Sequence, residues 1–140
     1  APARIGASVA YCAKQRLPEG GLGGTLELSD RQEDSTAILI VSGRIEMTTA
    51  EPFRDRLMTL LGGGLPLVID FSGVDYISSA GLRALMVAAK QARIAGTQLA
   101  VAALQPVVLE IFQISRFDKL LPCHPSVDAA LAAVRPGTGQ

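Results

Sequence analysis

The spacing of hydrophobic positions changes repeatedly from residue 25 onward, and each change marks a new predicted element. Short apolar runs indicate strands, and apolar residues three and four positions apart indicate helices. Strands are expected at 25–28, 37–41, 65–72 and 97–104, a brief strand or turn at 118–124, and helices at 48–61, 78–95, 106–115 and 126–134. Strands that alternate with helices of this length pair in parallel through right-handed crossovers. The predicted fold class is α/β, a single small mixed sheet of four or five strands with helices mainly on one face.

Polar segments predict the connections between these elements. Residues 29–36 are interpreted as the turn of a β-hairpin between the first two strands. The strand 65–72 is expected to end at Ser72, so that Asp75 lies in a loop that leads into the next helix. Ser78 or Ser79 would cap that helix, because a serine at this position satisfies a free backbone N–H.

Composition limits the partners and the compartment. A chain of 140 residues is expected to hold one domain, here at 25–134, with an N-terminal extension at 1–24 that ends in a flexible Gly-rich joint, and a tail at 135–140. Thirteen basic and thirteen acidic residues balance, so nucleic acid and anionic membranes are not expected partners. No apolar run is long enough for a membrane span. Cys12 and Cys123 are expected to be reduced thiols of a cytoplasmic protein.

The two adjacent serines at 78 and 79 carry the main functional hypothesis. One interpretation is a simple helix cap. The other is a phosphorylation switch, because the free N–H groups and the partial positive charge of a helix start hold a phosphate on a serine at that place. The phosphate would add roughly two negative charges and repel a partner. Gly81, which has no side chain, would allow that partner to come close.

Catalytic alternatives find little support in the sequence. The segment around the serines is not the G-x-S-x-G elbow of serine hydrolases, and the sole histidine, His124, is expected in a loop. No phosphate-binding G-x-x-x-x-G-K-[ST] run is present, which argues against a nucleotide-binding or hydrolysing domain. Neither cysteine has metal-ligand spacing. The protein is therefore expected not to be an enzyme and to need no cofactor and no metal.

Three blocks of the sequence stand out together, namely SGRIEMTTAEPFRDRL, LVIDFSGVDYISSAGLRALM and ALQPVVLEIFQISRFDKLLPCHPSVDAAL. They resemble the STAS domain of anti-sigma factor antagonists and of the cytosolic part of sulphate transporters. The resemblance implies a protein whose unphosphorylated form binds an ATP-dependent anti-sigma factor kinase and thereby frees the sigma factor. It also implies that the kinase phosphorylates a serine at a helix start, and that a metal-dependent serine phosphatase reverses the reaction.

The resemblance also implies which residues form the site. Its Gly-Leu pair aligns with Gly81 and the next residue, which makes Ser79 the phosphorylated serine and Ser78 the second choice. Glu46, Ser78, Ser79, Gly81 and Arg83 are the expected partner-binding residues. The family often has Asp where this chain has Ser78, so a STAS scaffold that is never phosphorylated, or a soluble component of a transport complex, remains the alternative.

Overall fold

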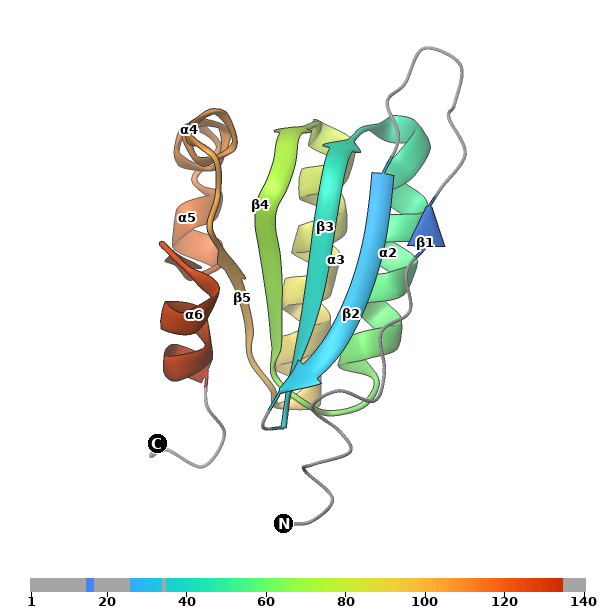
Figure 1. Ribbon diagram of the computed structural model, residues 1–140, viewed down its shortest axis with the longest axis vertical. Helices are drawn as coiled ribbons and strands as arrows, with labels where there is room; N and C mark the ends of the chain where they lie inside the picture. The colour runs from blue at the N-terminus through green and yellow to red at the C-terminus, as the bar shows by residue number, and fades with distance from the viewer. Residues whose placement is uncertain (1–14, 17–25, 34, 135–140) are drawn as a thin grey trace.

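Six strands lie side by side in one mixed sheet, in the same order as along the chain (Figure 1). The computed structural model describes residues 15–16, 26–33 and 35–134. The strands are β1 (Gln15–Arg16), β2 (Leu26–Glu33), β3 (Thr36–Ile45), β4 (Leu67–Ile77), β5 (Leu99–Ala102) and β6 (Cys123–His124). The first three pair antiparallel, and β3 to β6 pair parallel.

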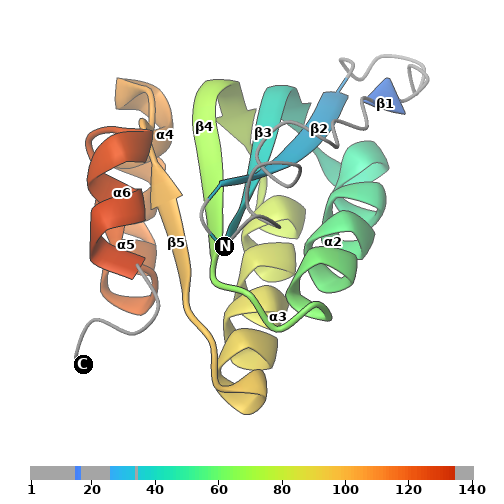
Figure 2. The same ribbon diagram turned by 60° about the horizontal axis from the view of Figure 1, so that its bottom comes forward.

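Helices cover both faces of this sheet unequally (Figures 1 and 2). They are α2 (Met47–Leu61), α3 (Ser79–Ala95), α4 (Pro106–Ile114), α5 (Phe117–Leu120) and α6 (Val127–Val134). Buried residues of α2 to α5 share one hydrophobic cluster, whereas Ala130 and Val134 of α6 belong to a separate, smaller cluster on the other side. The predicted mixed sheet with helices mainly on one face is confirmed. The two-residue β1 falls within the segment 1–24; the rest of that segment and the tail 135–140 lie outside the described residues.

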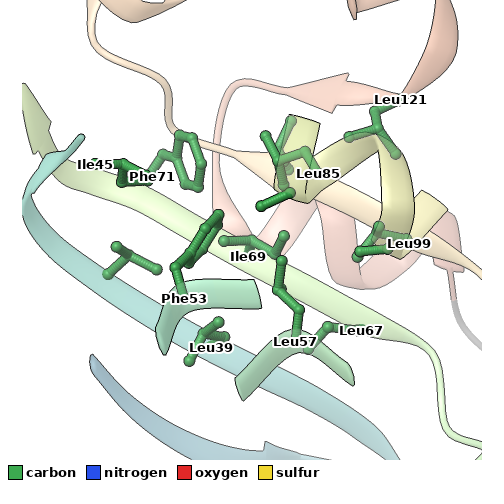
Figure 3. Packing of buried hydrophobic residues seen from close by; sticks show 14 of the residues in the cluster. Leu39, Ile45, Phe53, Leu57, Leu67, Ile69, Phe71, Leu85, Leu99 and Leu121 are labelled. Atoms are coloured by element: carbon green, nitrogen blue, oxygen red, sulfur yellow. The ribbon is translucent and has the colours of Figure 1, made fainter. Parts of the chain in front are cut away.

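The larger cluster is built around a row of aromatic rings. Phe53 of α2, Phe71 of β4, Phe112 of α4 and Phe117 of α5 follow one another with ring centroids 6.4, 6.1 and 5.8 Å apart. These are the only phenylalanines of the chain. Figure 3 shows Phe53 and Phe71 among aliphatic residues of the same cluster, such as Leu39, Ile69 and Leu85. Through β4, the row of rings connects α2, which precedes this strand in the sequence, with α4 and α5, which follow it.

The predicted hairpin turn at 29–36 is wrong, because both strands continue into that segment. β2 runs to Glu33 and pairs with β3 as far as Thr36. The polar Asp30 lies on the inner face beside Leu26 and Leu28 and is buried there. Arg56 of α2 donates to its carboxylate at 2.7 Å. A buried carboxylate is tolerated when a charged donor pairs with it. Asp30 can therefore occupy an inward-facing strand position, although an acidic residue there made the segment look like part of a turn.

The predicted end of the third strand at Ser72 is also wrong. β4 continues to Ile77, and both Ser72 and Asp75 lie within it. Two register shifts relative to β3 occur along this strand, one after Asp70 and one after Val74. Each shift is a β-bulge, in which an extra residue breaks the alternation of inward and outward side chains. The Ser72 N–H donates to the Asp70 carboxylate at 2.9 Å within the first bulge.

Candidate functional site

The starts of α2 and α3 are held next to each other by the parallel pairing of β3 and β4. Ile45 pairs with Ile77 at the carboxyl ends of these strands, and each is followed by one residue and then a helix. The Ser78 N–H donates to the Ile45 carbonyl at 2.8 Å. The register therefore brings Glu46 and Ser78 to the same edge of the sheet, where ligands gather in parallel sheets.

Ser78 and Ser79 have different roles in this arrangement. Ser78 is the N-cap of α3, and its hydroxyl accepts from the Gly81 N–H at 3.3 Å. Ser79 is the first helical residue and its side chain is exposed. In the described part of the chain, no hydrogen-bond partner is recorded for the Ser79 hydroxyl. The first turn of α3 contains no acidic residue, so the partial positive charge of the helix start is not compensated by its own side chains.

Glu46 occupies the corresponding N-cap position of α2 and is held by neighbours. Its backbone N–H donates to the Thr49 hydroxyl at 2.9 Å, and that hydroxyl donates to the Arg44 carbonyl at 3.0 Å. Its carboxylate accepts from Arg44 Nε at 2.5 Å. This hydrogen bond, with further attraction from Glu46 and Asp75, raises the pKa of Arg44 above its ordinary value. Glu46 was expected to bind a partner, and its carboxylate is already paired with Arg44.

Arg44 and Tyr76 belong to this edge and were not among the predicted site residues. They pair across β3 and β4, and the Arg44 guanidinium lies over the Tyr76 ring at 4.6 Å from its centroid. A cation over an aromatic face is attracted by the charge distribution of the ring. No sequence signal identifies this contact, because it depends on the register that the two bulges set.

Gly81 has a packing function in the structure. It is buried, and an added Cβ would lie 2.6 Å from Ile45 Cγ2 and 2.7 Å from Ile77 Cγ1. Only glycine fits where the first turn of α3 crosses the ends of β3 and β4. The geometry therefore does not support the expectation that Gly81 opens space for a partner, since that space is already filled by the two isoleucines.

Arg83, one of the expected partner-binding residues, is exposed and lines a groove between α2 and α3. The groove has a volume of about 370 Å³. The lining residues are Met47, Ala50, Glu51, Arg54, Ala80, Arg83, Ala84 and Val87. The groove begins beside Ser79, since Ala80 is one of its walls. A partner that docks over the serines would also meet this groove.

Further observations concern possible metal ligands, the histidine and the cysteine. No group of three potential metal ligands occurs among residues 15–16, 26–33 and 35–134. His124, expected in a loop, belongs to the two-residue strand β6. Burial raises the pKa of the Cys123 thiol to about 11, so it stays protonated at neutral pH. Within the same ranges, no helix is long and apolar enough to cross a membrane.

Comparison with known proteins identifies the family. The family model described as "Mlab, STAS domain" matches residues 28–122. BtrV of Bordetella bronchiseptica, named as an anti-sigma factor antagonist, is 34% identical over 111 residues, which cover 79% of this chain and 96% of BtrV. The anti-sigma-F factor antagonist RsfA of Mycobacterium tuberculosis is 24% identical over 112 residues, which cover 77% of this chain and 87% of RsfA.

A solved structure agrees with this assignment. The crystal structure of an anti-sigma factor antagonist from Mycobacterium paratuberculosis matches with a TM-score of 0.71 and 28% identity, over 79% of this chain and 94% of that one. This chain belongs to the STAS domain family. Within the family it groups with the anti-sigma factor antagonists, so the resemblance seen in its sequence is confirmed.

Proposed function

We propose that this protein is an anti-sigma factor antagonist controlled by phosphorylation of Ser79. In its unphosphorylated form it binds an anti-sigma factor kinase in the cytoplasm and frees the sigma factor. The kinase transfers a phosphoryl group from ATP to the Ser79 hydroxyl, and a metal-dependent serine phosphatase removes it. The protein contributes a surface and an acceptor hydroxyl, and it needs no cofactor of its own.

The difference between the two serines carries this proposal. Ser79 is exposed and its hydroxyl has no hydrogen-bond partner among residues 26–33 and 35–134, whereas the Ser78 hydroxyl already accepts from the Gly81 N–H. A phosphoryl acceptor has to enter the active site of another protein, which favours the exposed hydroxyl. A phosphate on Ser78 would also replace the hydroxyl that caps α3. Ser79 is therefore the proposed site, and Ser78 remains the second choice.

The electrostatic surroundings explain how the modification would act as a switch. At the start of α3 the backbone N–H groups of the first turn have no partner within the helix, so a phosphate there is stabilised and the fold is kept. The phosphate adds about 1.5 to 2 negative charges to an exposed position. A partner that contacts Ser79, Arg83 and the adjacent groove with acidic groups would then be repelled.

A phosphorylation assay tests the proposal directly. The chain is incubated with ATP and, in turn, each anti-sigma factor kinase of its source organism, and the intact protein is weighed by mass spectrometry. One phosphate is expected in the unmodified chain and in Ser78→Ala, and none in Ser79→Ala. Thr48→Ala is the matched control, because Thr48 is an exposed hydroxyl in the first turn of the neighbouring helix α2.

The same kinases provide a binding test. Ser79→Ala is expected to bind the kinase as the unmodified chain does, and Ser79→Asp is expected to bind at least about tenfold more weakly because of the added charge. Phosphate that persists in Ser79→Ala would move the site to another residue. A stable kinase complex without any phosphorylation, or a complex with a transporter instead, would favour the alternative of a STAS scaffold.

A further inference from the structure

The exposed side of α3 combines apolar and basic side chains. Six exposed residues of this helix follow one another at intervals of three, four or one positions and lie on one side of it. They are Ser79, Arg83, Met86, Val87, Lys90 and Ile94, and together we call them the α3 face. The whole of α3 contains three basic residues and no acidic residue, although the complete chain carries no net charge.

Exposed apolar side chains gather around this face. Met47, Met86, Val87 and Ile94 are exposed to 81, 46, 37 and 74%. In the described residues they are four of the seven large hydrophobic side chains that are exposed. Single exposed apolar residues are ordinary on a protein surface, but a group of them around one helix marks an interaction site.

The groove between α2 and α3 gives this surface a concave centre. Small residues from both helices, Ala50, Ala80 and Ala84, form part of its walls, so the helices leave an open space of about 370 Å³ between them. Arg54 and Arg83 also line it, and Glu51 is the one acidic residue among its lining residues. An apolar side chain fits the space between the alanines, and carboxylates could meet the two guanidinium groups.

The cations of this surface are available to a partner. In the described part of the chain no ion pair is recorded for Arg83 or Lys90. Arg54 lies 3.9 Å from Asp55 with both side chains largely exposed, and such a surface pair contributes little. Pairing of these cations with carboxylates of another protein would therefore break no strong ion pair within this chain.

We propose that the α3 face and the groove bind an acidic amphipathic helix of a partner protein. One apolar side chain of that helix enters the groove, others cover Met86 and Ile94, and its carboxylates pair with Arg83 and Lys90. The proposal rests on the proposed function in one respect, namely that the partner is the anti-sigma factor kinase. It adds the chemistry by which that partner is recognised and extends the contact along α3 as far as Ile94.

A membrane surface fits the same residues less well. Basic segments that bind anionic lipids carry clusters of about 4–8 Lys or Arg residues, whereas the α3 face and the groove together have three, Arg54, Arg83 and Lys90. A flat lipid surface would also leave the groove empty. A protein helix with alternating apolar and acidic sides satisfies both the groove and the cations.

An NMR titration with synthetic peptides tests this inference. The ¹⁵N-labelled chain is titrated with a peptide of about 18 residues, roughly five helical turns, that has leucines along one side and glutamates elsewhere. The matched peptide has lysine in place of every glutamate. Saturable shifts are expected for amides of residues 47–54 and 79–94, with a Kd at least about tenfold lower for the acidic peptide, equivalent to about 1.4 kcal/mol.

Variants of the chain separate the charge from the apolar contribution. Arg83→Glu combined with Lys90→Glu is expected to weaken the acidic peptide at least about tenfold, and Lys119→Glu, an exposed lysine of α5, serves as the charge control. Ile94→Ser is expected to weaken it about threefold through the lost apolar contact. Ile114→Ser is its control, because Ile114 is 76% exposed but lies on α4.

Several outcomes would overturn the inference. They are equal binding of the two peptides, shifts that map to another surface, charge reversals at Arg83 and Lys90 without effect, or tighter binding to phosphatidylglycerol vesicles than to the acidic peptide. The assay needs neither kinase nor phosphate, so its failure leaves phosphorylation of Ser79 standing. An absence of phosphorylation would equally leave a positive peptide result intact.

Discussion

The starts of α2 and α3 occupy equivalent places at the ends of two paired strands, but they are built differently. At α2 the capping residue is Glu46, whose backbone and side chain are held by Thr49 and Arg44. At α3 the capping residue is the neutral Ser78, whose hydroxyl accepts from the Gly81 N–H, and the next residue, Ser79, is exposed. The carboxylate at the start of α2 is therefore already paired, whereas the Ser79 hydroxyl at the start of α3 is accessible at the surface. This difference in side chains favours the start of α3 for the proposed phosphorylation, although the backbones of the two helix starts are alike.

The largest effect is expected where α3 crosses the strand ends. Gly81→Ala should lower the free energy of unfolding by about 2 kcal/mol, because its Cβ would overlap Ile45 and Ile77. Urea denaturation measures the change. Gly63→Ala is the control, since a Cβ there meets only the Leu60 carbonyl at 3.5 Å. A Gly81→Ala protein as stable as the unmodified chain would show that the two helix starts do not depend on this close contact.

Removing the hydrogen bonds of Thr49 at the start of α2 should have the next largest effect on stability. Thr49→Val keeps the shape of a buried side chain but removes the hydrogen bonds of its hydroxyl with the Glu46 N–H and the Arg44 carbonyl. We expect a loss of about 1.5 kcal/mol in the free energy of unfolding, because the Glu46 N–H and the Arg44 carbonyl lose their partner. Thr48→Val, at the exposed neighbouring position, should change stability by less than about 0.5 kcal/mol. Equal losses in the two variants would contradict the capping role of Thr49.

The smallest expected effect on stability distinguishes Ser78 from Ser79. Ser78→Ala removes the N-cap of α3 and should cost about 1 kcal/mol, whereas Ser79→Ala should stay within about 0.5 kcal/mol of the unmodified protein. Thermal and urea unfolding of both variants test this in the absence of any partner. If Ser79→Ala were the more destabilising change, the Ser79 hydroxyl would have a structural partner, and the case for its modification would weaken.

Helices and the overall fold class could be predicted from the sequence because their signals are local. The period of apolar residues in 79–95, the serine before it and Gly96 after it mark α3 without reference to the rest of the chain. The position of Ser78 and Ser79 at the helix start followed from the same signals. The exposure of Arg83 was predictable for the same reason.

Features that depend on distant residues could not be predicted in this way. Asp30 looked like a turn residue because its partner, Arg56, lies on a helix that follows in the sequence. β4 appeared to end at Ser72 because its two bulges break the period of two that identifies a strand. The contact of Arg44 with Tyr76 and Glu46 depends on that same register. Gly81 was interpreted as open space because the two isoleucines that fill it belong to other elements.

The bulges of β4 also determine where Ser79 lies relative to the end of β3. Between the pairs Ile40 with Asp70 and Ile45 with Ile77, β3 advances by five residues and β4 by seven. The two bulges take up these extra residues, which would be about 7 Å of extended strand at a rise of roughly 3.3 Å per residue, so that Ile77 still lies opposite Ile45. Inserting or deleting one residue in 70–76 should therefore displace the Ser79 hydroxyl from its place beside the start of α2, while the serine motif itself stays unchanged. Relatives that share the motif but differ in the length of this strand are the ones in which we expect the proposed switch to be lost.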